Sequence, residues 1–342
     1  MPNTISLATA FIATFACLWL LQPLAIRIGL VDAPRGRKQH QGHIPLIGGI
    51  AMFLGFLFSL LTLSISLLPY RSFIAACALL VFVGVLDDFH ELSARARLVA
   101  QAAAGLIMVL WGQISLHSFG NLLFIGNLHL GMLSLPVTLI AVIGVINAVN
   151  MTDGVDGLAG GVTLIELATL LFLAIQGNVF NDAVILLLIM ASLLAFLWFN
   201  FRFPWRKQAL VFMGDAGSMF LGLALVWFSV DLSQGHHYLA APAVMLWILA
   251  IPLFDTTGVI IRRLQKRQPV FSPDREHLHY LLKDAGFTTL QVTLILYITA
   301  LILAGIGVLL NKLHIAEGII FVSFLFMFGI YLLVLRYLRN IL

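Results

Sequence analysis

Charged residues are scarce in this 342-residue sequence: Asp, Glu, Lys and Arg make up 10% of it, whereas hydrophobic residues make up 61%. Soluble domains are about 25% charged and about 45–50% apolar. A membrane helix needs about 20 apolar residues, so the apolar content suffices for about ten crossings. This composition excludes a soluble enzyme, a disordered chain and a secreted disulfide scaffold. We expect an all-α polytopic integral membrane protein with no nucleic-acid partner.

Cysteine is nearly absent as well. The two cysteines, Cys17 and Cys77, lie in apolar runs without metal-ligand spacing, so we interpret them as small buried hydrophobic residues. Residues 1–7 carry no Lys or Arg, and a long apolar run follows them. We therefore expect no cleavable signal peptide.

The hydropathy pattern predicts eleven transmembrane helices in a single domain. The apolar runs lie at residues 4–26, 44–68, 72–86, 98–116, 132–148, 159–176, 182–199, 216–232, 240–260, 290–310 and 317–335. Alternate connectors carry only two basic residues, Arg71 and Lys312, while the other 17 Lys and Arg lie in the remaining connectors and the C-terminal tail. Because cytoplasmic loops carry the excess of Lys and Arg, we predict a periplasmic N-terminus and a cytoplasmic C-terminus.

Two adjacent acids, Asp87 and Asp88, close the third apolar run. Ionisable groups at membrane depth are costly and commonly mark a function. Consecutive residues on a helix point about 100° apart, so these carboxylates do not easily share one role. Their charge also opposes the dipole at a helix C-terminus, an objection that a bound divalent cation would remove. A solvated helix end is an equally good interpretation.

A polar motif follows the fifth run. Its amide and acid residues recur at every third position, so a tight or broken helical stretch would place them along one side: Asn147, Asn150, Asp153 and Asp156. Interleaved glycines, including Gly154 and Gly157, allow backbone to approach a ligand closely. An ordinary interhelical turn would not explain so many polar residues and glycines, and we favour a binding site.

Asp215 lies in a Gly-Asp-Ala-Gly-Ser stretch immediately before the eighth run. Two interpretations stay open: an N-cap for that helix, and a site for phosphate or metal-bound phosphate at the helix N-terminus. Glu166 is the acid that comes nearest to membrane depth, and we assign it no role.

Histidines and basic residues mark two further inside loops. Arg275, His277 and His279 suggest an anion site; zinc is an alternative, but no Cys or third nearby His supports it. Lys38 and His40 lie in the first inside loop, where positive-inside bias and binding of anionic lipid headgroups explain basic residues equally well. Gly48 and Gly49, which follow, would permit close helix packing.

Carboxylates, glycines and cations on one side of a membrane suit a metal-bound polyphosphate better than a proton path, because a pump would place ionisable groups deep in the bilayer. A cation-coupled membrane transporter that uses the same carboxylates is the alternative from another class.

With these motifs, the sequence resembles the polyprenyl-phosphate N-acetylhexosamine-1-phosphate transferases, glycosyltransferase family 4. The matching stretches occur in order over nearly the whole chain, at 29–34, 37–40, 45–49, 87–88, 147–161, 213–218, 272–279 and 285–287. Within the family, it looks most like the bacterial enzymes that transfer GlcNAc-1-phosphate to undecaprenyl phosphate. The usual His-x-His-His motif ends in Tyr280 here, and the triple-His motif of the peptidoglycan branch is absent.

The resemblance implies a phosphoglycosyl transferase of the bacterial inner membrane, with an active site that faces the cytoplasm. The phosphate of undecaprenyl phosphate would attack the β-phosphorus of UDP-GlcNAc and release UMP, as the first membrane step of O-antigen or related cell-surface polysaccharide synthesis. Donors with GalNAc, QuiNAc or FucNAc stay open, as does a homodimer. A direct attack and a two-step route through an aspartyl-phosphate both fit, and we favour the direct attack.

The resemblance also implies roles for individual residues in loops 27–43, 87–97, 147–161, 200–218 and 261–289. The expected Mg²⁺ ligands, with Mn²⁺ as a substitute, are Asp87, Asp88 and Asp215. The expected catalytic residues are Asp87, Asp88, Asp153 and Asp156. The expected substrate-binding residues are Lys38, His40, Asn147, Asn150, Gly154, Gly157, Asn200, Arg275, His277 and His279.

Overall fold

The computed structural model of the chain describes residues 4–32, 42–206, 208–235, 238–269 and 276–341. Its helices are α1 (Thr4–Ile28), α2 (Gly48–Leu60), α3 (Arg71–His90), α4 (Ala94–Leu106), α5 (Ser134–Thr152), α6 (Leu158–Gln176), α7 (Phe180–Asn200), α8 (Gly214–Ser233), α9 (Pro242–Ile248), α10 (Ala250–Gln265), α11 (Leu278–Asp284), α12 (Thr289–Lys312) and α13 (Glu317–Ile341). Two short strands, β1 (Val31–Asp32) and β2 (Ile44–Pro45), pair antiparallel.

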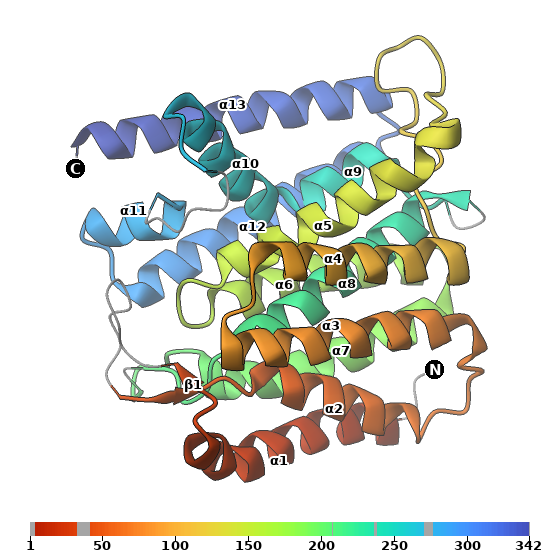
Figure 1. Ribbon diagram of the computed structural model, residues 1–342. Coiled ribbons are helices and arrows are strands. Elements are labelled where there is room, and N and C mark those ends of the chain that lie inside the picture. The colour runs from red at the N-terminus through yellow and green to blue at the C-terminus, as the bar shows by residue number, and fades with distance from the viewer. Residues whose placement is uncertain (1–3, 33–41, 207, 236–237, 270–275, 342) are drawn as a thin grey trace.

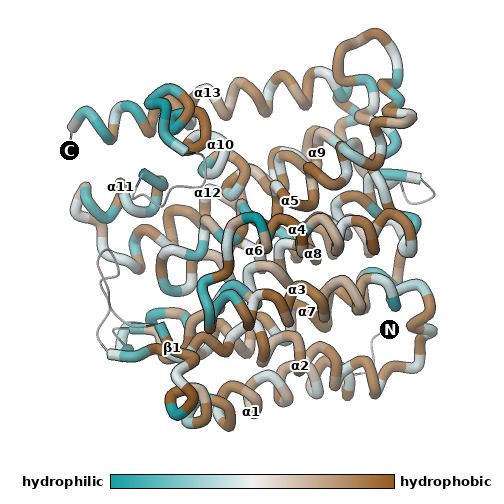
Figure 2. Tube along the Cα trace, in the orientation of Figure 1, coloured by the Kyte–Doolittle hydropathy of each residue, from teal (hydrophilic) through white to brown (hydrophobic). Residues whose placement is uncertain are grey.

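The helices lie side by side in one bundle, with β1, α11 and the C-terminus at one end and the N-terminus at the other (Figure 1). Apolar residues follow the helices along their length, whereas hydrophilic residues gather around β1, α11 and the last turns of α13 (Figure 2). We call this hydrophilic end the polar end. The predicted topology, with a periplasmic N-terminus and a cytoplasmic C-terminus, stays a prediction.

Within the described residues, nine helices are long and apolar enough to cross a membrane, and the pair α9–α10 makes ten if it is one broken span. The chain is thus a polytopic, predominantly α-helical membrane protein. The expected span at 44–68 is represented by α2, which has 13 residues, fewer than the roughly 20 that a crossing needs. The expected span at 240–260 is bent by 83° where Leu249 leaves helical geometry. The expectation of an all-α polytopic membrane protein is confirmed, and the strands β1 and β2, of two residues each, are a local addition to it.

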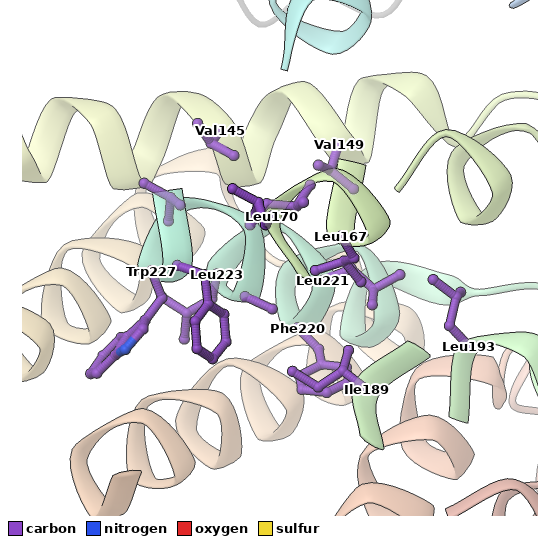
Figure 3. Close-up of a cluster of buried hydrophobic side chains, with 14 of the residues drawn as sticks. Val145, Val149, Leu167, Leu170, Ile189, Leu193, Phe220, Leu221, Leu223 and Trp227 are labelled. Atoms are coloured by element: carbon purple, nitrogen blue, oxygen red, sulfur yellow. The ribbon is translucent and has the colours of Figure 1, made fainter. Parts of the chain in front are cut away.

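The bundle is built around α8. Nearly every residue of α8 from Ala216 to Ser233 is buried, and its apolar side chains meet those of α5, α6 and α7 in one cluster (Figure 3). Trp227 and Phe73 of α3 pack edge to face, with ring centroids 5.1 Å apart. A helix that is apolar on all sides is typical of a bundle centre.

Small residues set the distances between the helices around α8. A Cβ on Gly49 of α2 would lie 2.1 Å from the backbone nitrogen of Gly217, and a Cβ on Gly84 of α3 would lie 2.4 Å from the Cα of Ala216. Contacts this close require glycine, as in other membrane helix pairs. The expectation that Gly49 permits close packing is confirmed. These close contacts also fix the positions of α2 and α3 along the axis of α8, at its first turn.

The chain before α8 is held by backbone hydrogen bonds to the β2–α2 junction. The N–H groups of Gly48 and Gly49 donate to the carbonyls of Phe212 and Met213, and the N–H of Phe212 donates to the carbonyl of Pro45. These bonds place the N-terminus of α8 at the polar end.

Candidate active site

The N-terminus of α8 is capped by a carboxylate from another helix. Asp88, in the last turn of α3, accepts hydrogen bonds from the N–H groups of Asp215 at 2.9 Å and Ala216 at 3.5 Å. The positive end of the α8 dipole favours this charge, which offsets the unfavourable place of Asp88 at the end of α3. Gly214 has a φ of +69°, and a Cβ there would lie 2.5 Å from an Asp88 oxygen. Asp88, rather than Asp215, is therefore the cap of α8.

Asp87 faces a different neighbour. Its carboxylate accepts hydrogen bonds from the N–H of Leu92 at 2.7 Å and from the guanidinium of Arg97 at 3.2 Å. It is 4% exposed and lies within hydrogen-bonding reach of the Asp215 carboxylate. The prediction that the adjacent acids Asp87 and Asp88 make different contacts is confirmed.

Asn150 links the end of α5 to the start of α8. Its amide donates to the Asp215 carboxylate and, at 2.9 Å, to the hydroxyl of Ser218. Asn147, one turn earlier, instead donates to Gln101 of α4 at 2.7 Å and to its own helix. Of the two asparagines, Asn150 joins the acidic cluster and Asn147 binds α4.

Asp153 follows the last residue of α5 and is close to several other acids. Burial, together with the smaller effect of the charges of Asp215, Asp156 and Asp32, raises its pKa to about 7. Because like charges disfavour the ionised form, this turn is a place where a cation would be strongly stabilised.

Asp156 supports the segment that leads to α8. Its carboxylate forms an ion pair with Arg202 at 2.7 Å and accepts the N–H of Ala209 at 2.9 Å. The predicted single row of amide and acid side chains is therefore wrong for the described contacts: α5 ends at Thr152, so the helical period stops before Asp156.

Asn200 and Gly157 brace the same turn. The Asn200 side chain accepts the N–H of Gly157 at 2.7 Å and donates to the carbonyl of Val211 at 2.9 Å. Gly157 has a φ of +81°, and its carbonyl accepts a hydrogen bond from the Tyr297 hydroxyl. The Asn200 amide holds backbone on both sides, and its role in substrate binding stays a prediction.

The two histidines lie next to the Asp153–Gly154 turn. His277 is hydrogen-bonded through Nδ1 to Asp255 at 2.7 Å, and the ring of His279 stacks on it with centroids 5.5 Å apart. A Cβ on Gly154 would lie 2.3 Å from Nε2 of His279, and the tilted ring of Tyr280 packs against the His279 ring with centroids 4.3 Å apart. Burial lowers the pKa of His279 to about 4, so its ring is neutral at physiological pH.

Three predicted site residues, Lys38, His40 and Arg275, lie outside the described residues. Most of the remaining predicted residues gather at the polar end, where α3, α5, α8 and α11 begin or end.

A family model described as glycosyl transferase family 4 matches residues 70–233. Three relatives named undecaprenyl-phosphate alpha-N-acetylglucosaminyl 1-phosphate transferase, from Escherichia coli K12, Salmonella typhimurium LT2 and Haemophilus influenzae, are 37%, 39% and 38% identical to this chain. The alignments cover 95%, 95% and 96% of this chain and 89%, 89% and 92% of the relatives. The chain belongs to glycosyl transferase family 4.

The part of this family 4 chain that matches the model contains the acidic cluster, from Asp87 to Asp215. Among the described residues, no three His, Cys, Asp or Glu side chains are already arranged as a metal site. Mg²⁺ usually takes one or two protein carboxylates and completes its coordination with water and substrate phosphates. The close approach of the acceptor-only carboxylates of Asp87 and Asp215, beside Asp88, fits that donor set. The zinc alternative at His277 and His279 gains no support from the described residues.

Sequence reasoning missed three residues of this transferase. Arg97 and Arg202 pair with predicted site acids, and loop composition offers no signal for such pairings. Asp255 lies inside the apolar run 240–260, which is itself a signal for function. Asp255 is buried in α10, as Glu166 is in α6. Neither carboxylate oxygen of Glu166 has a partner among the described residues.

Proposed function

We propose that this chain transfers GlcNAc-1-phosphate from UDP-GlcNAc to undecaprenyl phosphate, giving undecaprenyl-diphosphate-GlcNAc and UMP. The observation that carries the proposal is the convergence of Asp87, Asp88, Asp215 and Asn150 at the polar end of a membrane bundle. Such a site suits the diphosphate of a nucleotide sugar, and the names of the relatives support this donor and acceptor.

In the reaction, an oxygen of the lipid phosphate attacks the β-phosphorus of the donor and forms a new P–O bond. The bond from the β-phosphorus to the bridging oxygen breaks, and that oxygen leaves with UMP. Phosphate monoesters lose their second proton near pH 6, so the attacking oxygen needs no strong base. Catalysis of phosphoryl transfer depends mainly on positioning and electrostatic stabilisation, and we favour direct attack over a phospho-aspartate route.

Asp88 and Asp215, with Asp87, would hold Mg²⁺ or its substitute Mn²⁺. The chemistry that a bound divalent cation supplies here is neutralisation of the diphosphate charge. Asn150 orients the Asp215 carboxylate by donating to it, and the Arg97 guanidinium fixes Asp87. Both contacts keep the acids in place before substrate arrives.

An apolar cavity of about 400 Å³ has room for part of the hydrocarbon chain of a lipid acceptor. It lies among α5, α8, α9 and α10, and its lining includes Gly144, Val145, Val226 and Leu246. Hydrocarbon-lined cavities of this size bind apolar ligands. We assign part of the isoprenoid chain of undecaprenyl phosphate to this cavity.

The polar end faces the cytoplasm in this proposal, since it carries the connectors rich in Lys and Arg. The chain would therefore use cytoplasmic UDP-GlcNAc at the bacterial inner membrane, as the first membrane step of O-antigen or related polysaccharide synthesis.

The test is UMP release by the purified protein in detergent. We expect release only when UDP-GlcNAc, undecaprenyl phosphate and Mg²⁺ are all present, loss of release with EDTA, and recovery with added Mg²⁺. No UMP with all three components would refute the proposal. Uptake of a substrate into vesicles without UMP would favour the transporter.

Two further measurements refine the proposal. A panel of UDP-GlcNAc, UDP-GalNAc and related donors, with chromatographic detection of the lipid product, identifies the sugar. Incubation with β-³²P-labelled UDP-GlcNAc alone distinguishes the mechanisms: direct attack leaves the protein unlabelled, whereas a covalent intermediate on Asp87 or Asp88 would carry the label.

A further inference from the structure

Asp255 stands apart from the acidic cluster and is the least expected charged group near the site. It lies in α10, just after the 83° bend that separates α10 from α9, and its side chain is 5% exposed. The bend turns this part of α10 towards α11 and the end of α5, where Asp255, Thr152 and His279 line one small cavity. A buried carboxylate in a membrane span needs hydrogen-bond donors.

Three hydrogen-bond donors, from the start of α11 and from α13, bind the Asp255 carboxylate. The carboxylate of Asp255 accepts the Nδ1 proton of His277 at 2.7 Å on one oxygen. Its other oxygen accepts the N–H of Leu278 at 2.9 Å and the hydroxyl of Tyr331 at 2.8 Å. His277 is the N-cap residue of α11 but makes no side-chain cap bond of its own. Asp255 therefore holds both the first turn of α11 and the preceding His277 ring by hydrogen bonds.

The hydrogen bond to Asp255 defines which ring nitrogen of His277 carries a proton. A carboxylate only accepts hydrogen bonds, so Nδ1 of His277 carries the proton that is shared with Asp255. The same arrangement of a carboxylate and a histidine fixes tautomer and orientation in many enzymes.

The orientation of the His277 ring determines that of the His279 ring, because the two rings pack against each other. The rings of His277 and His279 are nearly parallel, with an interplanar angle of 11°. The Nε2 atom of His279 is buried against Gly154 and has no hydrogen-bond partner among the described residues. This nitrogen is an unsatisfied polar atom beside the Asp153–Gly154 turn, and a ligand bound at that turn would supply its missing partner.

The geometry points to Asp255 as the positioning residue that holds His277 and His279 against the Asp153–Gly154 turn, where they contact the diphosphate of the nucleotide-sugar donor. This assignment rests on the proposed function for the identity of the ligand. Asp255 itself touches no reacting atom. Its effect passes through the two rings.

The first experiment reads the His277 ring directly, in ¹⁵N-histidine-labelled protein at pH 8, by NMR in detergent micelles. The chain has 10 histidines, and the His277 signals are assigned by their loss in His277→Gln. We expect a proton on Nδ1. A proton on Nε2 with a bare Nδ1 would overturn the assignment, and this measurement requires neither activity nor a folded Asp255 variant.

The second experiment separates the two substrates by kinetics. Asp255→Asn can donate to Nδ1 and favours the opposite tautomer, so we expect kcat/KM for UDP-GlcNAc to fall roughly 10- to 100-fold, the range for carboxylates that orient metal-bound histidines. The KM for undecaprenyl phosphate should stay near its wild-type value. Its His277 ¹⁵N signals should change together with the rate.

Tyr331→Phe is the matched control, because it removes one donor to the same carboxylate and leaves the bonds from His277 and Leu278. We expect a wild-type tautomer and a nearly wild-type rate. Equal losses in Asp255→Asn and Tyr331→Phe, with an unchanged His277 signal, would show a merely structural role and refute the inference. Absence of UMP release by the wild-type protein would instead refute the proposed function and leave the NMR result to stand.

Discussion

The replacement Asp88→Asn separates the structural role of this residue from its catalytic role. The amide keeps a carbonyl oxygen for the N–H of Asp215, now 2.9 Å away, and gives up the charge and the 3.5 Å contact with Ala216. A charge at a helix N-terminus contributes about 0.3–1 kcal/mol, and up to about 2 kcal/mol when partly buried. Loss of repulsion from Asp215 acts in the opposite direction. We expect the free energy of unfolding to fall by about 1 kcal/mol or less.

The rate should change far more than the stability. Removing one group that stabilises developing charge costs about 100- to 1000-fold in kcat, which corresponds to about 3–4 kcal/mol. UMP release at saturating substrates measures kcat. The unfolding midpoint in detergent can be followed with a thiol-reactive dye, because Cys77 is fully buried in α3 and reacts when the bundle opens.

Glu166→Gln is the control for this comparison, since it converts a buried acid of α6 to the amide away from the cluster. We expect wild-type turnover for it. If Asp88→Asn kept nearly wild-type kcat while its unfolding midpoint fell, Asp88 would be a helix cap alone, and the metal and phosphate roles of the cluster would be wrong.

Three further predictions concern the histidine, the turn and the cavity. Gly154→Ala places a methyl group 2.3 Å from Nε2 of His279, so we expect a higher KM for UDP-GlcNAc. The control Gly305→Ala, whose methyl group meets nothing within 4 Å, should keep the wild-type KM. Equal KM values for the two variants would contradict the placement of His279. His279 has a pKa lowered by burial to about 4 against 6.5 in the unfolded chain, so its contribution to stability is complete above pH 6.5 and is lost as the pH falls towards 4. The unfolding midpoint of wild type should therefore drop more steeply over that range than the midpoint of His279→Phe, and parallel curves would refute this. Gly144→Leu fills part of the cavity and should raise the KM for undecaprenyl phosphate with little change in the KM for UDP-GlcNAc; an unchanged acceptor KM would remove the isoprenoid chain from this cavity.

Hydropathy predicted most of the bundle, because a membrane span must hide its backbone polar groups in a long apolar helix. It could not predict where such a run stops being helical. The run at 44–68 contains a 13-residue helix followed by turns, and the run at 240–260 contains the bend at Leu249. Both runs stay apolar where the helix ends or bends. Hydropathy therefore gives no signal for the position of a helix end or a bend within such a run.

Local geometry predicted part of the site. The 100° step along a helix correctly separated Asp87 from Asp88, since both residues lie within α3. The three-residue period failed between Asn147 and Asp156, because α5 ends at Thr152 and the turn redirects the later side chains. Contacts between distant segments, such as Asp255 with His277, depend on how α10 and α11 pack, and no local pattern contains them.

The site is positioned mainly by helix packing. Asp88 and Asp215 sit on α3 and α8, whose spacing is set by the contact of Gly84 with Ala216, one residue after Asp215. The contact of Gly49 with Gly217 fixes α2 against the same turn. Close-packed interiors transmit small displacements, so a side chain added at Gly84 would shift Asp88 relative to Asp215 without touching either carboxylate. The glycines of α2 and α3 therefore determine the geometry of a charged site whose carboxylates they do not touch.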